Sequence, residues 1–133
     1  MAIVLDTDIV SYLYKQDTRA ALYEQHLTDP PFIISFMTLA ELRRWMRERN
    51  WGARRRKQLE TYLERYLIVY ADDALCERWA EATDSGRRSG KPISVADAWI
   101  AATALSFSVP LVTHNAGDYA GVAGLTVISE SQT

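Results

Sequence analysis

Four acidic residues in this chain directly follow apolar runs or stand near the start of helix patterns: Asp6, Glu41, Asp97 and Asp118. If the apolar runs are parallel strands, the functional crevice is expected beyond their carboxyl ends, and all four acids can meet there. Carboxylates gathered without Lys or Arg among them repel one another, so such a cluster usually holds a divalent cation. Oxygen ligands favour Mg²⁺ or Mn²⁺ over zinc. These residues therefore predict a Mg²⁺ or Mn²⁺ site at one edge of a sheet.

Each acid also has a purely structural interpretation. Glu41 and Asp97 each complete a capping-box pattern, in which the acid side chain satisfies a backbone N–H group at a helix start. Asp8 can cap a helix, and Asp118 can form an Asx turn. Either interpretation suits any single acid, whereas four acids at one edge favour the metal site.

The elements that must position these acids are centred on an apolar helix and the strand after it. Ser94 can cap this helix, and Asp97 lies in its first turn. Nearly every side chain in residues 98–107 is apolar, and a helix that is apolar on every side belongs inside a core. Residues 109–113 then predict a short buried strand that ends at Thr113.

Further strands and helices alternate along the chain. Strands are also predicted at residues 2–5, 32–34, 68–70 and 125–128. Helices are predicted at residues 9–14, 18–27, from 38 onward, 53–67 and 73–85. Such alternation indicates an α/β fold, a three-layer α/β/α sandwich with a central, mostly parallel sheet. We expect residues 1–133 to form one domain, because this length supports a single core.

Length and composition exclude several classes of protein. The chain has 133 residues and a formal net charge of −2, and no apolar run is long enough to cross a membrane. Asp6 and Asp8 fall where the apolar part of a signal peptide would lie. Cys76 is the single cysteine, so we expect it to be a thiol of the core in a reducing compartment. A cytoplasmic protein is the expectation.

Ordered sequence blocks resemble PIN-domain ribonucleases of the VapC toxin type, which are found in toxin–antitoxin pairs. The similarity extends over essentially the whole chain in the correct order. The matching blocks are Leu5-Asp6-Thr7-Asp8-Ile9, Thr38-Leu39-Ala40-Glu41-Leu42, Asp97-Ala98-Trp99-Ile100-Ala101-Ala102-Thr103-Ala104, Leu111-Val112-Thr113-His114-Asn115, Asp118-Tyr119 and Gly124-Leu125.

This resemblance implies a Mg²⁺-dependent (or Mn²⁺-dependent) endoribonuclease toxin that is neutralised by a VapB-type antitoxin. Asp6, Glu41 and Asp97 match the family's three core acids, and Asp118 matches its more variable fourth acid. Three polar residues match positions that line or adjoin the family's site: Asp8, Thr113 and Asn115. The resemblance also implies a homodimer and an antitoxin whose tail occupies the cleft.

A basic segment lies between Arg43 and Lys57, where eight Lys or Arg residues accompany one acid, Glu48. Phosphate contacts dominate affinity for nucleic acids, so this segment is a candidate for contact with RNA. It could equally be a solvated helix face or a surface that meets acidic residues of a partner. The candidate contacts with RNA or antitoxin are Arg43, Arg44, Arg54, Arg55 and Arg56. Trp45 and Trp51 could stack on bases, or serve in packing or dimer contacts.

Two other functions remain open at this point. Asp6-Thr7-Asp8-Ile9-Val10 also fits the opening motif of haloacid-dehalogenase-like phosphatases, but Asp97 lacks the acidic neighbour that this class needs late in the chain. A PIN-like module that binds RNA or protein without catalysis is the second alternative. The complete set of acids argues against it.

Overall fold

A computed structural model describes residues 2–131, whose five strands form one sheet in the order β3-β2-β1-β4-β5. The strands are β1 (Ile3–Leu5), β2 (Phe32–Ser35), β3 (Leu67–Val69), β4 (Leu111–Val112) and β5 (Val127–Ile128). All neighbouring pairs are parallel. The helices are α1 (Thr7–Lys15), η1 (Thr18–His26), α2 (Phe36–Glu48), α3 (Ala53–Leu63), α4 (Asp73–Arg88), α5 (Val95–Phe107) and η2 (Ala116–Tyr119).

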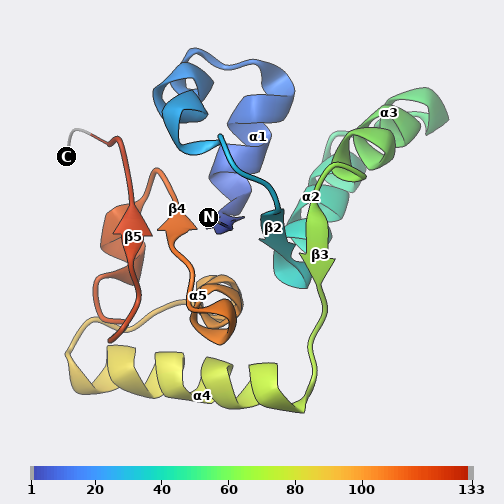
Figure 1. The fold of residues 1–133 in the computed structure, drawn as a ribbon. Helices are drawn as coiled ribbons and strands as arrows, with labels where there is room; N and C mark the ends of the chain where they lie inside the picture. The colour runs from blue at the N-terminus through green and yellow to red at the C-terminus, as the bar shows by residue number, and fades with distance from the viewer. Residues whose placement is uncertain (1, 132–133) are drawn as a thin grey trace.

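Alternate residues of the central strand β1 enter two separate cores, one on each face of the sheet. Ile3 and Leu5 pack with residues of α1, η1, α2 and α3. Val4 instead packs with residues of α4 and α5, which lie together on one side of the sheet (Figure 1). This alternation is what a strand covered by helices on both faces requires. The predicted three-layer α/β/α sandwich is therefore confirmed.

The apolar helix α5 is buried as predicted. Ala98 and residues 100–104 are all buried, and the helix packs against α4 and the central strands. Ser94 caps it, because its hydroxyl oxygen accepts a hydrogen bond from the backbone N–H of Asp97 at 3.1 Å. The capping prediction at this helix is confirmed, and the same cap places the Asp97 carboxylate at the helix start.

The capping prediction for α2 was wrong. This helix begins at Phe36, and its cap is Ser35, whose hydroxyl accepts from the N–H of Met37. Thr38 lies inside the helix and is buried. Glu41 therefore lies in the second helical turn, where no free backbone N–H group remains for its side chain to cap.

Three other predictions also differ from the structure. Residues 18–26 form a 3₁₀ helix instead of an α-helix. Asp6, and not Asp8, is the cap of α1, since its carboxylate accepts from the N–H of Thr7. Cys76 is exposed on α4 and does not belong to the core. None of the helices in the described residues is long and apolar enough to span a membrane.

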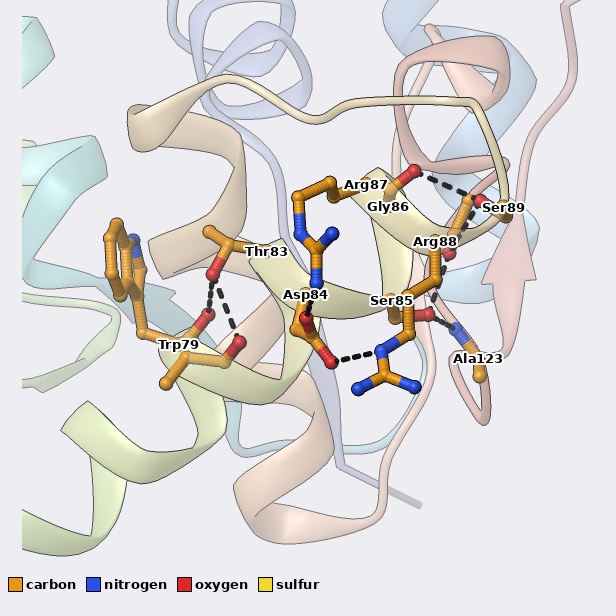
Figure 2. A network of polar contacts seen from close by, with 11 residues as sticks. Trp79, Thr83, Asp84, Ser85, Gly86, Arg87, Arg88, Ser89 and Ala123 are labelled. Carbon is orange, nitrogen blue, oxygen red and sulfur yellow. Dashed lines mark hydrogen bonds and ion pairs between the residues drawn. The ribbon is translucent and has the colours of Figure 1, made fainter.

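The end of α4 is held against the loop after η2 by a polar network (Figure 2). The Ser85 hydroxyl donates to the carbonyl oxygen of Gly121 at 2.7 Å and accepts from the N–H of Ala123 at 2.9 Å. A side chain on Gly121 would collide with the carbonyl oxygen of Lys91. Glycine is therefore required here by the close approach of two backbones, and this contact ties η2 to the helical layer.

Candidate active site

Asp6 is the centre of a polar network at the carboxyl end of the sheet. It directly follows β1, and its neighbour Thr113 directly follows β4, the strand paired with β1. One carboxylate oxygen of Asp6 accepts from the hydroxyls of Thr113 at 2.7 Å and Tyr119 at 3.0 Å. The side chain is only 6% exposed, so these hydroxyls replace water as its hydrogen-bond partners.

The hydroxyl of Tyr119 connects Asp6 with Asp97. It lies 3.0 Å from Oδ2 of Asp6 and 3.2 Å from Oδ1 of Asp97. A phenol carries one proton, so it can donate to only one of the two carboxylates at a time. The fold has thus brought two acids, one from the end of a strand and one from a helix start, to a single buried hydroxyl.

Asp8 lies beside this pair and is held by the loop after β4. One of its carboxylate oxygens accepts from the backbone N–H of His114 at 3.0 Å and from the side-chain amide of Asn115 at 2.7 Å. The N–H of Asn115 in turn donates to the Thr113 hydroxyl. The three polar positions that the resemblance named, Asp8, Thr113 and Asn115, therefore belong to one network with Asp6.

Glu41 joins the site through Thr7, the residue between Asp6 and Asp8. The Thr7 hydroxyl donates to Oε1 of Glu41 at 2.7 Å and lies 2.9 Å from the hydroxyl of Thr38. Glu41 is therefore oriented by a hydroxyl of α1 instead of by its own helix start. Asp118 is exposed; burial raises the pKa of Asp97, and the negative charge of Asp118 raises it further.

Burial and mutual repulsion change the acidity of three of these groups. Burial, together with the charge of Asp8 and then of Asp97, raises the pKa of Asp6 to about 7. Burial also raises the pKa of Asp8 and of Asp97. Within residues 2–131, no Lys or Arg forms an ion pair with any of the three. Among the described residues, none of the three acids therefore has a Lys or Arg partner that would stabilise its ionised form.

The donor chemistry of this cluster fits a hard divalent cation. Its groups are carboxylate and hydroxyl oxygens, which suit Mg²⁺ and Mn²⁺. In the described residues, no three His, Cys, Asp or Glu side chains are close enough together to enclose a metal ion. The four predicted ligands are thus brought to one region but not into a closed cage, and the Tyr119 hydroxyl bridges two of them.

The basic segment does not form one continuous surface. Arg43 pairs with Glu60 at 3.1 Å, and Arg44 pairs with Glu48 at 3.5 Å. Arg56 donates from Nε to the carbonyl oxygen of Trp51. Arg55 lies over the Trp51 ring, whereas Arg54 lines a separate hollow with residues of its own helix. Helix rotation and local pairing have distributed these cations over different faces.

Comparison with known proteins identifies the family and the fold. A model of the PIN domain matches residues 3–125. Ribonuclease VapC1 of Haemophilus influenzae (strain R2866) is 30% identical over 131 residues, covering 94% of this chain and 95% of that protein. The structure of VapBC-1 from nontypeable Haemophilus influenzae matches with a TM-score of 0.78 at 26% identity, covering 97% of this chain and 98% of that one. VapBC2 from Rickettsia felis, in a structure bound to a promoter DNA fragment, matches with a TM-score of 0.83 at 22% identity, with the same coverage.

The match to the family model extends over most of the chain, from residue 3 to residue 125. This chain belongs to the PIN domain family, and its relative at 30% identity places it among the VapC-type ribonucleases. The resemblance predicted from the sequence blocks is confirmed. The haloacid-dehalogenase-like interpretation of the opening motif is thereby excluded.

Two residues of the site were not predicted from the sequence. Tyr119 is 2% exposed and contacts two of the acids, and Thr7 orients Glu41. Both lie inside the sequence blocks that carried the resemblance. Tyr119 directly follows Asp118, and Thr7 lies between Asp6 and Asp8. This adjacency to predicted acids was the sequence feature that could have identified both residues.

Proposed function

We propose that this chain is a Mg²⁺- or Mn²⁺-dependent endoribonuclease toxin that hydrolyses phosphodiester bonds of RNA at the Asp6 cluster. The observation that carries this proposal is that buried Asp6 and half-buried Asp97 share the Tyr119 hydroxyl at the carboxyl end of the sheet. Within residues 2–131, neither acid forms an ion pair with Lys or Arg. The relatives named ribonuclease VapC support the choice of RNA as the substrate.

Asp6, Glu41 and Asp97 would hold the metal, with Asp118 adding negative charge from the exposed rim. When bound, the ion would lower the pKa of a water molecule and stabilise charge on the leaving oxygen. The side chains around the acids have a positioning role. Thr113 and Tyr119 donate to Asp6, Thr7 donates to Glu41, and these hydrogen bonds orient the carboxylates.

The same relatives support a protein partner. The solved structures of VapBC pairs support a VapB-type antitoxin as the partner of this chain, and we propose that its tail occupies the cleft at the acidic cluster. We also propose a homodimer, a single domain over residues 1–133 and a cytoplasmic location, in accord with the expectations from the sequence. A non-catalytic RNA-binding module is the remaining alternative, and the activity assay distinguishes it.

The test is incubation of the purified chain with total cellular RNA in Mg²⁺ or Mn²⁺, followed by mapping of the new RNA ends. We expect discrete internal cuts that EDTA abolishes, and no cuts by the Asp97→Asn variant. Cleavage that persists in EDTA would contradict the metal-dependent mechanism. RNA binding without any cleavage would indicate the non-catalytic module instead.

A further inference from the structure

Two adjoining hollows lead from the acidic cluster to a pair of tryptophans. The first has a volume of about 260 Å³, and Thr7, Asp8 and Glu41 lie among its lining residues. Lys15 and Trp45 line it as well, and both also line a second hollow of about 420 Å³. The second hollow is lined by Tyr14, Lys15, Trp45, Arg49, Trp51 and Arg55. A ligand that reaches the acids can therefore continue past Trp45 into the second hollow.

Three cations lie over the two indole rings. The Lys15 ammonium is 4.5 Å from the centre of the Trp45 ring, and the Arg49 guanidinium is 5.4 Å from the same ring. The Arg55 guanidinium is 4.2 Å from the centre of the Trp51 ring. The two rings contact each other, with their centres 4.9 Å apart. An indole face attracts a cation and restricts its motion, so this pair of rings holds three otherwise flexible side chains in place.

These three cations differ from their neighbours in the basic segment. Lys15, Arg49 and Arg55 are exposed, and within residues 2–131 none of them forms an ion pair with a carboxylate. Arg43 and Arg44 are each paired with a Glu. The positive charge of the second hollow is thus available to an anionic ligand.

We propose that Lys15, Arg49 and Arg55, ordered by Trp45 and Trp51, form a phosphate-binding subsite for the RNA strand whose scissile bond lies at the acids. This inference rests on the proposed ribonuclease function. RNA is favoured because its backbone would run without interruption from the acids into the second hollow and place a phosphate among the cations. Trp51 is only 8% exposed, and cations lie over both rings, so the rings position charges and do not stack on bases.

The first experiment measures binding of a fluorescent single-stranded RNA in EDTA over a range of salt concentrations. The triple variant Lys15→Gln, Arg49→Gln, Arg55→Gln keeps a polar side chain at each position but loses the charges. We expect its slope of log affinity against log salt to fall by about 2, since each phosphate contact on a single strand contributes about 0.7. In Mg²⁺, KM for cleavage should rise about tenfold at low salt and kcat should change little, as expected for lost binding away from the reacting bond.

A matched control removes arginines that are already paired with a carboxylate. Arg87 and Arg88 on α4 both pair with Asp84, at 2.6 and 2.7 Å (Figure 2). The variant Arg87→Gln, Arg88→Gln should keep the parental salt slope and KM. Trp45→Leu should raise KM without removing any charge, and Trp45→Phe, which retains an aromatic face for Lys15, should recover part of the parental value.

The possible outcomes distinguish a failure of this inference from a failure of the proposed ribonuclease function. A parent that cleaves RNA, together with a folded triple variant of unchanged salt slope, overturns the inference and assigns this surface to a protein partner. A loss of kcat with unchanged KM also overturns it. A parent that cuts no RNA with either metal instead overturns the proposed function. Thermal unfolding of each variant establishes that it is folded.

Discussion

At the scale of single residues, the burial of Asp6 decides the behaviour of the site. A carboxylate removed from water and placed near Asp8 and Asp97 holds its proton up to about pH 7 in the metal-free protein. In the unfolded chain the same group releases its proton near pH 3.8. Between these values the folded state binds more protons than the unfolded state, so the stability of the metal-free protein falls as pH rises.

This linkage predicts a stabilising substitution. Asp6→Asn keeps an oxygen that can accept from Thr7, Thr113 or Tyr119 but has no proton to release. In EDTA, the variant should gain stability over the parent as pH rises from about 4 to about 8, by up to about 4 kcal/mol. Urea unfolding at several pH values measures this difference. An advantage that does not vary with pH would contradict the assigned pKa of Asp6.

The hydroxyl of Tyr119 gives a second prediction at this scale. Tyr119→Phe keeps the buried ring but removes the donor shared by Asp6 and Asp97. We expect a loss of about 1–3 kcal/mol in stability, because a buried acceptor loses its partner. Cleavage should fall about 10- to 100-fold, since partners that orient metal-binding groups have effects of this size. Tyr70→Phe, at a residue that is 63% exposed, is the control and should change neither quantity.

At the scale of elements, the contact between α4 and the loop after η2 sets the position of Tyr119. The loop follows η2 directly, and Ser85 of α4 binds its backbone on both sides of Val122. Gly86 on α4 also approaches the backbone closely, since a side chain there would lie 2.9 Å from the carbonyl oxygen of Lys91. Two glycines thus permit the close packing that holds η2 against the sheet.

Gly121→Ala should therefore be destabilising. The added methyl group would meet the backbone oxygen of Lys91 and the Ser89 hydroxyl, and overpacking of this kind costs about 1–3 kcal/mol. Gly117→Ala is the matched control, because a methyl group there meets nothing within 4 Å, and its effect should stay below about 1 kcal/mol. Urea unfolding of both variants checks the prediction, which fails if they are equally stable.

At the scale of the whole molecule, three structural layers supply the acids that meet at one edge. Asp6 comes from the sheet, Asp97 from the helical layer of α4 and α5, and Glu41 from α2 on the opposite face. A cation bound by all three would connect the layers. Any ligand that binds only the folded state stabilises the whole fold.

Metal should therefore stabilise the parent more than an Asp97 variant. With Mn²⁺ at about 100 times its Kd, the parent should gain roughly 2.7 kcal/mol over its stability in EDTA. Asp97→Asn should gain less, and in EDTA it should be at least as stable as the parent, because one repelling charge is removed. Thermal melts with and without Mn²⁺ measure both effects.

Asp73→Asn is the matched control for this experiment. Asp73 also lies in the first turn of a helix, α4, so the substitution removes the same favourable interaction with a helix N-terminus. Its metal response should equal that of the parent. If Asp97→Asn behaves in the same way and still cleaves RNA, Asp97 acts only at the helix start.

Local patterns in the sequence determined most of the secondary structure. Apolar runs placed the five strands within a few residues of their observed positions, and Ser94 correctly marked the start of α5. These features depend on neighbouring residues along the chain, through alternation, helical spacing and backbone capping. The order of the acids along those elements also sufficed to indicate the family.

Only the tertiary structure decided which acids meet at the site and which Lys and Arg side chains remain free of ion pairs and available to a ligand. The cap of α2 is Ser35, three residues before the expected cap Thr38. Glu41 therefore lies against Thr7 instead of its own helix end. Asp6 and Asp97 meet at Tyr119, while Arg43 is neutralised by Glu60. Successive side chains of a helix point about 100° apart, so a small change in where a helix begins or how it is rotated redirects every side chain that it carries. Contacts between residues distant in the chain depend on that rotation and on the packing of layers, which no local pattern contains.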